Sequence, residues 1–455
     1  MSVQSAVQPT GAEHHFGVDE LFFSTTDRKG VIEQANSTFV RLSHYTHEEL
    51  VGSPHNIVRH PDMPGGAFKL VWDELLAGRP ACAYVNNLAK DGGSYWVFAT
   101  LLPLGEGFLS VRMRPLAKDF WDASRNLYHF ANPAERRARE EGASRHDAAV
   151  KGAETLAHGL SSLGIPSFEA FTRTTLPAEM AQHALYSEGL PQRPEATGPL
   201  ADILECMHAL DDETALLVDQ LDEYAAVAGE LRATAATATP TIERLASVMR
   251  SAREGAASVS EQAPELVTLA EEMGERAGSA SGELTELSPR LSSLEDQVGR
   301  MRLRIALLRL HNIMVGTFAA ELIDGNRPTE DIRDTRESMR LLCEALGEGA
   351  QAVATDVREV REQMGVVPDQ IRAAVREVDR FRRPLYKWQD MCAESGVTDQ
   401  MAEATASMEA QTQQGFSELE QLSSLAARLR LLDIPFDEQA IRGDIDAIRA
   451  DLAQG

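Results

Sequence analysis

The sequence contains few cysteines and few aromatic residues. Phe, Trp and Tyr together make up 6% of its 455 residues, and its four cysteines are Cys82, Cys206, Cys343 and Cys392. The cysteines lie far apart, with neither the dense spacing of a disulfide framework nor the paired spacing of a zinc knuckle. Thiols that stay reduced are typical of the cytosol, so we expect a cytoplasmic protein without disulfides.

The sequence also lacks a long uncharged apolar run. The most apolar stretch, residues 305–323, is interrupted by Arg309, His311 and Glu321, whereas a membrane-spanning helix needs about 20 predominantly apolar residues. We therefore expect this stretch to be a buried helix of a soluble bundle. No apolar segment follows a basic start at the N-terminus, so we also expect no signal peptide.

Basic residues are scarce relative to acidic ones. The chain has 44 Lys and Arg against 70 Asp and Glu, which gives a formal net charge of -26. An acidic surface repels the phosphates of nucleic acids and the head groups of anionic lipids. We therefore expect protein partners and no binding to nucleic acid.

Catalytic signatures are missing as well. The sequence has no Gly-rich phosphate loop, no His-Glu-x-x-His motif and no Gly-x-Ser-x-Gly motif, the patterns that position phosphates, zinc and a nucleophilic serine. It also lacks the ATP-binding motifs of histidine kinases and the signature of diguanylate cyclases. We expect a protein that is not an enzyme.

The order of the predicted elements divides the chain in two. After a polar N-terminus, residues 1–16, which we expect to be disordered, strand-like and helical segments alternate up to residue 116. The strand-like runs are residues 22–25, 31–34, 83–87, 95–100 and 108–112. Two strands, short helices and then three strands predict an α+β domain with helices packed on one side of a sheet.

After residue 116 the strand signals end. Residues 117–199 predict a helical connector that ends in a proline-rich linker, residues 187–199. In residues 200–455 apolar residues recur at alternating spacings of three and four, as in a coiled coil or helical bundle. We expect prolines to interrupt this helical region at positions 240, 264, 289, 328, 368 and 384.

A turn is predicted at residues 324–328, Asp-Gly-Asn-Arg-Pro. Gly325 and Asn326 readily adopt left-handed backbone geometry, and Pro328 cannot continue a helix. The flanking helices should therefore form an antiparallel hairpin. Asn312, a polar residue on the apolar seam, is expected to fix register or oligomeric state, and we expect a homodimer through these helices.

The segment from Asn56 to Pro64, Asn-Ile-Val-Arg-His-Pro-Asp-Met-Pro, gathers cations, a carboxylate and two prolines in one irregular turn. With its flanks, residues 22–32 and 90–97, it resembles the PAS domain of bacterial aerotaxis receptors. The resemblance covers residues 17–116. It implies a five-stranded antiparallel sheet with short helices, a role in sensing redox state or oxygen, and FAD as the cofactor.

The resemblance also implies which residues hold the FAD. The residues that match those implicated in FAD binding in that family are Asn36, Arg59, His60, Asp62 and Trp72, with Asn87 as a further candidate. A tryptophan suits the wall of a flavin site, asparagine offers amide hydrogen bonds, and arginine meets phosphate oxygens in a bidentate way.

Each of these residues also has a structural interpretation. Trp72 lies on a helical apolar stripe and suits a core position, Asn36 suits a helix cap, and Arg59 with Asp62 suits a surface ion pair. The histidines at positions 44, 47, 55 and 60 lack metal-ligand spacing, so we expect no metal or haem site there.

The sequence departs from the family's pattern after the turn at residues 78–80. Ala81 replaces a large aromatic residue, and Asn86, Asn87 and Leu88 replace a basic strand. These departures leave three alternatives open, which are a weaker flavin site, a pocket for another ligand and an empty pocket.

We therefore expect a soluble signal-transduction protein that senses redox state or oxygen through a PAS-bound flavin. Its helices would relay the signal to a signalling partner. One alternative is a cofactor-free PAS scaffold or adaptor. Another is a chemoreceptor output that binds a chemotaxis kinase and its coupler, because residues 307–312 distantly resemble the signalling tip of methyl-accepting chemotaxis proteins. Residues 314–318 depart from that family.

Overall fold

The computed structural model describes residues 7–325 and 329–454. The chain divides into two compact units. The first combines Met1–Ala215, Arg302–Val353 and Asp437–Gly455, and the second combines Leu216–Met301 and Ala354–Phe436. The first unit contains the α+β domain, and the second is built from long helices.

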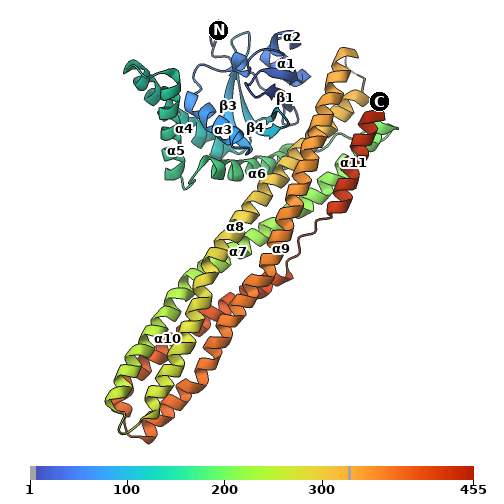
Figure 1. The fold of residues 1–455 in the computed structure, drawn as a ribbon. Helices are drawn as coiled ribbons and strands as arrows, with labels where there is room; N and C mark the ends of the chain where they lie inside the picture. The colour runs from blue at the N-terminus through green and yellow to red at the C-terminus, as the bar shows by residue number, and fades with distance from the viewer. Residues whose placement is uncertain (1–6, 326–328, 455) are drawn as a thin grey trace. The chain divides into compact units, whose positions relative to one another are not determined.

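A five-stranded antiparallel sheet forms the core of the N-terminal domain (Figure 1). Its strands are β1 (Phe22–Asp27), β2 (Ile32–Ala35), β3 (Ala81–Leu88), β4 (Ser94–Leu104) and β5 (Gly107–Met113). They are ordered β2-β1-β5-β4-β3, and each neighbouring pair is antiparallel. The fold class predicted for this domain is therefore confirmed.

Short helices pack on this sheet. They are α1 (Ser37–Ser43), α2 (His47–Leu50), a 3₁₀ turn (His55–Val58) and α3 (Gly65–Leu76). The core between α1 and the sheet is aromatic, because Phe22 stacks on Tyr95 with ring centroids 5.8 Å apart and also packs against Phe39. Burying one such side chain contributes about 1.5–3 kcal/mol.

The expected connector begins with three helices that pack on the α+β domain. They are α4 (Lys118–Glu140), α5 (Arg145–Ser162) and α6 (Phe168–Tyr186). The two Glu135 oxygens accept hydrogen bonds from the backbone N–H groups of Gly65 and Gly66 at 2.8 and 2.7 Å. This α4 carboxylate therefore caps the N-terminus of α3, whose first-turn N–H groups have no partner within the helix.

A buried polar contact joins α6 to the sheet. Tyr84 in β3 donates a hydrogen bond to Glu179 Oε1 (2.8 Å), and Glu179 Oε2 accepts from the backbone N–H of Leu116 (2.8 Å). Burial raises the pKa of Glu179. Residues 187–198, in the predicted linker, contain no helix or strand.

The N-terminal segment differs from its prediction. Residues 1–6 lie outside the described residues, but the backbone N–H groups of Thr10 and His14 donate to Gly92 O (2.8 Å) and Ser94 O (2.7 Å). Phe16 is 8% exposed and packs edge-to-face on Phe22. The predicted disorder therefore does not extend to residues 10–16, because they bond to the turn between β3 and β4.

Long helices make up the rest of the chain. They are α7 (Pro199–Ser258), α8 (Glu265–Ile323), α9 (Thr329–Glu394), α10 (Thr398–Leu431) and α11 (Glu438–Gln454). The helical region predicted from the sequence is therefore confirmed. Among the helices of the described residues, α8 alone has an 18-residue window apolar enough to span a membrane, and 72% of that window is buried within the structure.

Most prolines of this region do not interrupt its helices. Prolines 240, 289, 368 and 384 lie inside α7, α8 and α9, so the prediction of breaks there is wrong. Pro264 lies between α7 and α8, and Pro328 is outside the described residues. A proline inside a helix costs about 3 kcal/mol, and apolar side chains that remain fully buried on both sides, such as Leu287 and Leu291, offset that cost.

Helices α8 and α9 run antiparallel, as the predicted hairpin requires. Within the first unit Arg304 donates to Ala352 O (2.9 Å), and within the second Gln370 donates to Glu283 O (3.0 Å). Gly325 has a φ of +67° at the end of α8. The rest of the predicted turn, residues 326–328, lies outside the described residues.

Asn312 is fully buried, and its Nδ2 donates to Met207 O in α7 (2.8 Å). The bond fixes the position of α8 against α7 within one chain.

Candidate functional site

A cavity of about 260 Å³ lies in the N-terminal domain between α3, residues 54–59 and the sheet. Its apolar walls include Met63, Phe68, Val71, Trp72, Val85 and Leu101. Protein cores are close-packed and contain few voids larger than a water molecule. A mostly apolar cavity with a few polar groups is the usual form of a small-molecule site.

Helix α3 supplies one wall of the cavity because its apolar stripe faces the sheet. Val71 and Leu75 are buried against Ala81, Ala83 and Phe108. Trp72 packs edge-to-face on Phe108 with ring centroids 5.2 Å apart and also lines the cavity. Trp72 therefore serves both as a core residue and as part of the cavity wall, because its ring packs against Phe108 and also lines the cavity.

Arg59 and Asn87 lie side by side at the cavity. Their backbones form an isolated antiparallel bridge, and both residues are in the cavity lining. Arg59 Nη2 donates to Met63 O (2.8 Å), and its guanidinium lies 4.3 Å from the centroid of the Phe68 ring. Burial lowers the pKa of Arg59. The structure thus brings together Arg59, Trp72 and Asn87 of the six residues predicted for the site.

Asn36, His60 and Asp62 are not in the lining of this cavity. Asn36 is a buried cap, because its Oδ1 accepts from the backbone N–H groups of Phe23 (3.0 Å) and Phe39 (3.1 Å) and its Nδ2 donates to Leu21 O (2.9 Å). These bonds tie α1 to β1.

His60 and Asp62 shape the turn before α3. His60 is 7% exposed, its Nδ1 accepts from the backbone N–H of Asp62 (3.2 Å), and burial lowers its pKa. The Asp62 side chain is 89% exposed, and its backbone oxygen accepts from Asn132 of α4 (2.6 Å). Their role in cofactor binding stays a prediction.

Arg112 is a cavity residue that the sequence interpretation missed. It lies on β5, is 4% exposed, and donates through Nη2 to Ser24 Oγ (3.1 Å) and His55 Nε2 (2.6 Å). Burial lowers its pKa to about 10, so it is still charged at neutral pH. No carboxylate of the described residues pairs with it, and its buried Nη1 has no hydrogen-bond partner there. The available signal was a single arginine directly after the largely apolar strand residues Phe108 to Val111.

His55 is the second missed residue. It lines the cavity, stacks on Phe39, and has a pKa well below the ordinary value because it is buried beside the Arg112 cation. A guanidinium can only donate hydrogen bonds, so His55 Nε2 must accept. His55 is therefore neutral, with its proton on Nδ1.

The sheet also contacts two of the long helices within the first unit. Phe23 of β1 packs edge-to-face on Phe318 of α8, with ring centroids 5.5 Å apart. Ser338 of α9 donates to Gln34 Oε1 of β2 (3.0 Å). Because β1 also carries Ser24, which holds Arg112, the same strand touches the polar edge of the cavity and helix α8.

Comparison with known proteins defines the class of this domain. Residues 32–107 match the family model for the PAS fold, and the N-terminal domain is a PAS domain. The chain is 46% identical over 101 residues to the aerotaxis receptor of Escherichia coli strain K12. That match covers 21% of this chain and 20% of the receptor, so the chain corresponds to about a fifth of its relative's length.

A solved structure is also similar to this chain. The PAS domain of a protein from Colwellia psychrerythraea is 23% identical, with a TM-score of 0.19, and the match covers 21% of this chain and 86% of that one. The matches to the PAS family model and to the aerotaxis receptor confirm, for the N-terminal domain, the resemblance predicted from the sequence, and the similarity to a receptor supports a role in sensing.

Proposed function

We propose that this protein is a cytoplasmic signal-transduction protein whose PAS domain binds FAD in the cavity beside α3 and so senses redox state or oxygen. In this proposal residues 17–116 are the sensor, residues 117–199 the connector and residues 200–455 the signalling bundle. The chain acts as a homodimer on a signalling partner, for which a chemotaxis kinase or its coupler is the candidate.

The observation that carries the proposal is the unpaired N–H of Arg112 beside an apolar cavity. A buried donor without an acceptor costs about 1–3 kcal/mol, and more when it is charged. A ligand that presents an oxygen or a negative edge to Nη1 removes this cost. A flavin ring has such an edge, and when bound it supplies a centre that can be reduced and reoxidised.

The other residues of the cavity suit different parts of the cofactor. Phe68 and Trp72 provide aromatic surface for a ring, and Asn87 offers an amide. Arg59 is half-buried and suits a phosphate. A change in charge at Arg112 reaches Ser24 and His55 through hydrogen bonds. Strand β1 then passes it to Phe318 of α8 through Phe23, which is the packing change that the helices would relay.

The experiment is a spectrum of the purified full-length chain, followed by FAD titration of any cofactor-free fraction by fluorescence quenching. We expect a flavin spectrum and release of FAD on denaturation. Arg59→Ala with Trp72→Ala should abolish binding while the helical circular dichroism is kept. The matched control combines Arg28→Ala with Phe130→Ala, two exposed side chains away from the cavity. A colourless chain that takes up no FAD overturns the proposal.

A second candidate is the cofactor-free scaffold, and the cavity volume favours it. Ligand pockets are typically about 300–1,000 Å³, and this cavity of about 260 Å³ is smaller. It accepts a ring system, but the rest of a dinucleotide must lie outside it. Signalling by the Arg59→Ala, Trp72→Ala variant at the wild-type level would select the scaffold.

A further inference from the structure

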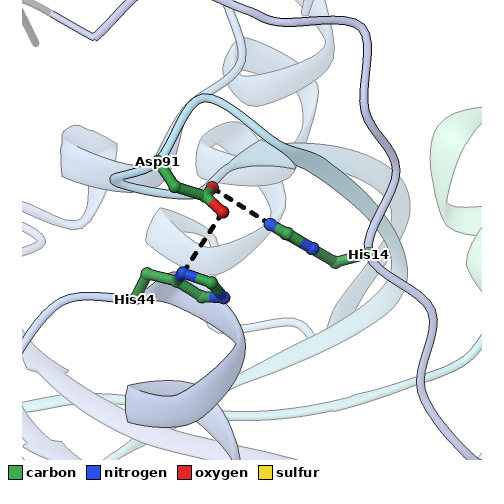
Figure 2. A group of neighbouring side chains, drawn as sticks. All are labelled: His14, His44 and Asp91. Carbon is green, nitrogen blue, oxygen red and sulfur yellow. Dashed lines mark hydrogen bonds and ion pairs between the residues drawn. The ribbon is translucent and has the colours of Figure 1, made fainter.

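Two histidines and an aspartate from three separate segments meet at the turn between β3 and β4 (Figure 2). His14 Nε2 lies 3.0 Å from Asp91 Oδ1, and His44 Nδ1 lies 3.2 Å from Asp91 Oδ2. The two imidazole rings stack with their centroids 4.7 Å apart. One donor atom from each residue lies within 4.8 Å of the other two. Sequence spacing did not indicate this group, because its members are far apart in the chain.

The backbone holds His14 and His44 in place. His14 N–H donates to Ser94 O (2.7 Å), and Ser94 N–H donates to Ala12 O (2.8 Å). His44 ends α1 with a φ of 57°, and among the described residues it is the one non-glycine residue with positive φ. Left-handed geometry at a residue with a side chain costs about 1–3 kcal/mol, and here it ends α1 and fixes the direction of the backbone that carries the His44 ring.

Gly93 leaves room for this arrangement. A Cβ atom at Gly93 would overlap the His14 ring. Its N–H donates to Asp91 Oδ1 (2.9 Å), which orients the carboxylate. The site therefore has an outer hydrogen bond of the kind that orients metal ligands.

The donor atoms of the group are of two kinds. Asp91 supplies a carboxylate, and His14 and His44 supply two imidazole nitrogens. The ion-pair partners of Asp91 are the two histidines, while the adjacent Lys90 pairs with Glu49. One carboxylate is thus faced by two imidazoles, a ligand set that suits a cation accepting electron pairs from all three.

We propose that His14, His44 and Asp91 bind a divalent transition-metal ion of the zinc class. Zinc takes imidazole nitrogens at about 2.0–2.1 Å and carboxylate oxygens at about 2.0–2.2 Å, which places neighbouring tetrahedral ligands roughly 3.3 Å apart. The nitrogen–oxygen distances of 3.0 and 3.2 Å are close to that spacing, and each imidazole faces a different oxygen of Asp91. Water fills the fourth position, because the three side chains are 24–43% exposed. The ion joins the N-terminal segment to α1 and to the β3–β4 turn.

The test is Zn²⁺ titration of the full-length chain, without a histidine tag, by isothermal titration calorimetry, and Co²⁺ substitution followed by visible absorption. We expect one Zn²⁺ per chain at this group and the absorption bands of a four-coordinate Co²⁺ site. Asp91→Asn keeps the shape of the side chain, and it should weaken binding by more than the roughly 10–100-fold that loss of an outer-shell partner costs. His14→Ala with His44→Ala should abolish binding.

His15→Ala is the matched control, because His15 is the exposed neighbour of His14 and is not in the group. It should bind Zn²⁺ as the wild type does. Binding that survives His14→Ala with His44→Ala, or a wild-type chain that binds no Zn²⁺ at micromolar concentrations, overturns the proposal. Since the three side chains lie at the surface, circular dichroism should show that each variant still folds. The outcome is independent of FAD binding.

Discussion

The PAS domain contains two polar groups with opposite charge imbalance. At the cavity, the Arg112 cation is buried and, among the described residues, has no carboxylate partner and bonds to neutral Ser24 and His55. At the β3–β4 turn, the Asp91 anion is partly exposed and is faced by two histidines. Buried charge without a partner is costly, whereas an exposed charge is solvated by water. The first group therefore calls for an acceptor or anionic ligand, and the second for a cation.

The largest expected effect concerns a third polar group, the buried His311 of α8. Burial lowers its pKa to about 4, and its Nε2 has no partner among the described residues. The folded state binds fewer protons than the unfolded state between pH 6.5 and 4, so stability falls as the pH falls through that window. The loss should approach about 3 kcal/mol.

Urea denaturation at pH 7, 5.5 and 4.5 measures this loss. His311→Leu should flatten the dependence, and His158→Leu, at an exposed position, should leave it intact. Equal pH dependence in the wild type and His311→Leu would show that other groups, such as His55, account for it.

The second prediction tests the cavity. Arg112→Met keeps the side-chain length but removes all five donors, and it should weaken FAD binding roughly 10- to 150-fold, because a hydrogen bond to a charged group contributes about 1.5–3 kcal/mol. Arg112→Lys should lie in between, since it keeps the charge without the fork. Fluorescence titration measures both, with Arg114→Met, an exposed arginine of the same segment, as the control.

Unchanged FAD affinity in Arg112→Met would contradict the assignment of this residue to the ligand. The buried Arg112 cation would then no longer indicate that the cavity binds an acceptor or anionic ligand.

The third prediction tests the surface group without removing any of its members. Gly93→Ala should displace the His14 ring and release the N-terminal segment, at a cost of about 1 kcal/mol or less. Hydrogen exchange of residues 7–16 should become faster. Gly278→Ala is the control of opposite sign, because its Cβ meets no atom within 4 Å inside α8 and should stabilise by about 0.5–1 kcal/mol. Unchanged exchange in Gly93→Ala would show that His14 does not hold the segment.

The smallest effect is acid release of the same segment. Because the folded-state pKa of Asp91 is below its unfolded value of 3.8, the contribution of Asp91 is present above pH 3.8 and is lost as the pH falls through the lowered value. Exchange of residues 7–16 should therefore rise only in strong acid. Asp91→Asn should remove this step while leaving the exchange of β1 unchanged.

The sequence predicted the elements whose signals are local. Alternation and turn residues located the five strands, the stripe of α3 followed from residues 67–76, and the three-and-four spacing identified the long helices. The proline prediction was wrong for Pro240 and Pro289 because it considered only the local free-energy cost of a proline inside a helix. The burial of apolar side chains on both sides of the proline offsets that cost.

The parts that could not be predicted depend on contacts between distant residues. Arg112 meets His55 across 57 positions, and His14 meets Asp91 across 77. Neither pairing has a characteristic sequence spacing, because His55 and His14 lie outside the strands and reach their partners only in the folded domain. Asn36 shows a different limit, because a sequence alone does not distinguish an asparagine that caps a helix from one that binds a cofactor.

The bond from Glu135 to the start of α3 has a practical consequence for dissecting this chain. Truncation at residue 116 removes the Glu135 carboxylate that caps the first turn of α3. It also removes α5, which packs so closely on α3 that a Cβ at Gly66 would overlap Gly152 and Ala153. Such a fragment would lose contacts that hold α3, the helix that carries Trp72, against the domain. A reliable minimal fragment for ligand studies should therefore extend to at least the end of α6, at Tyr186.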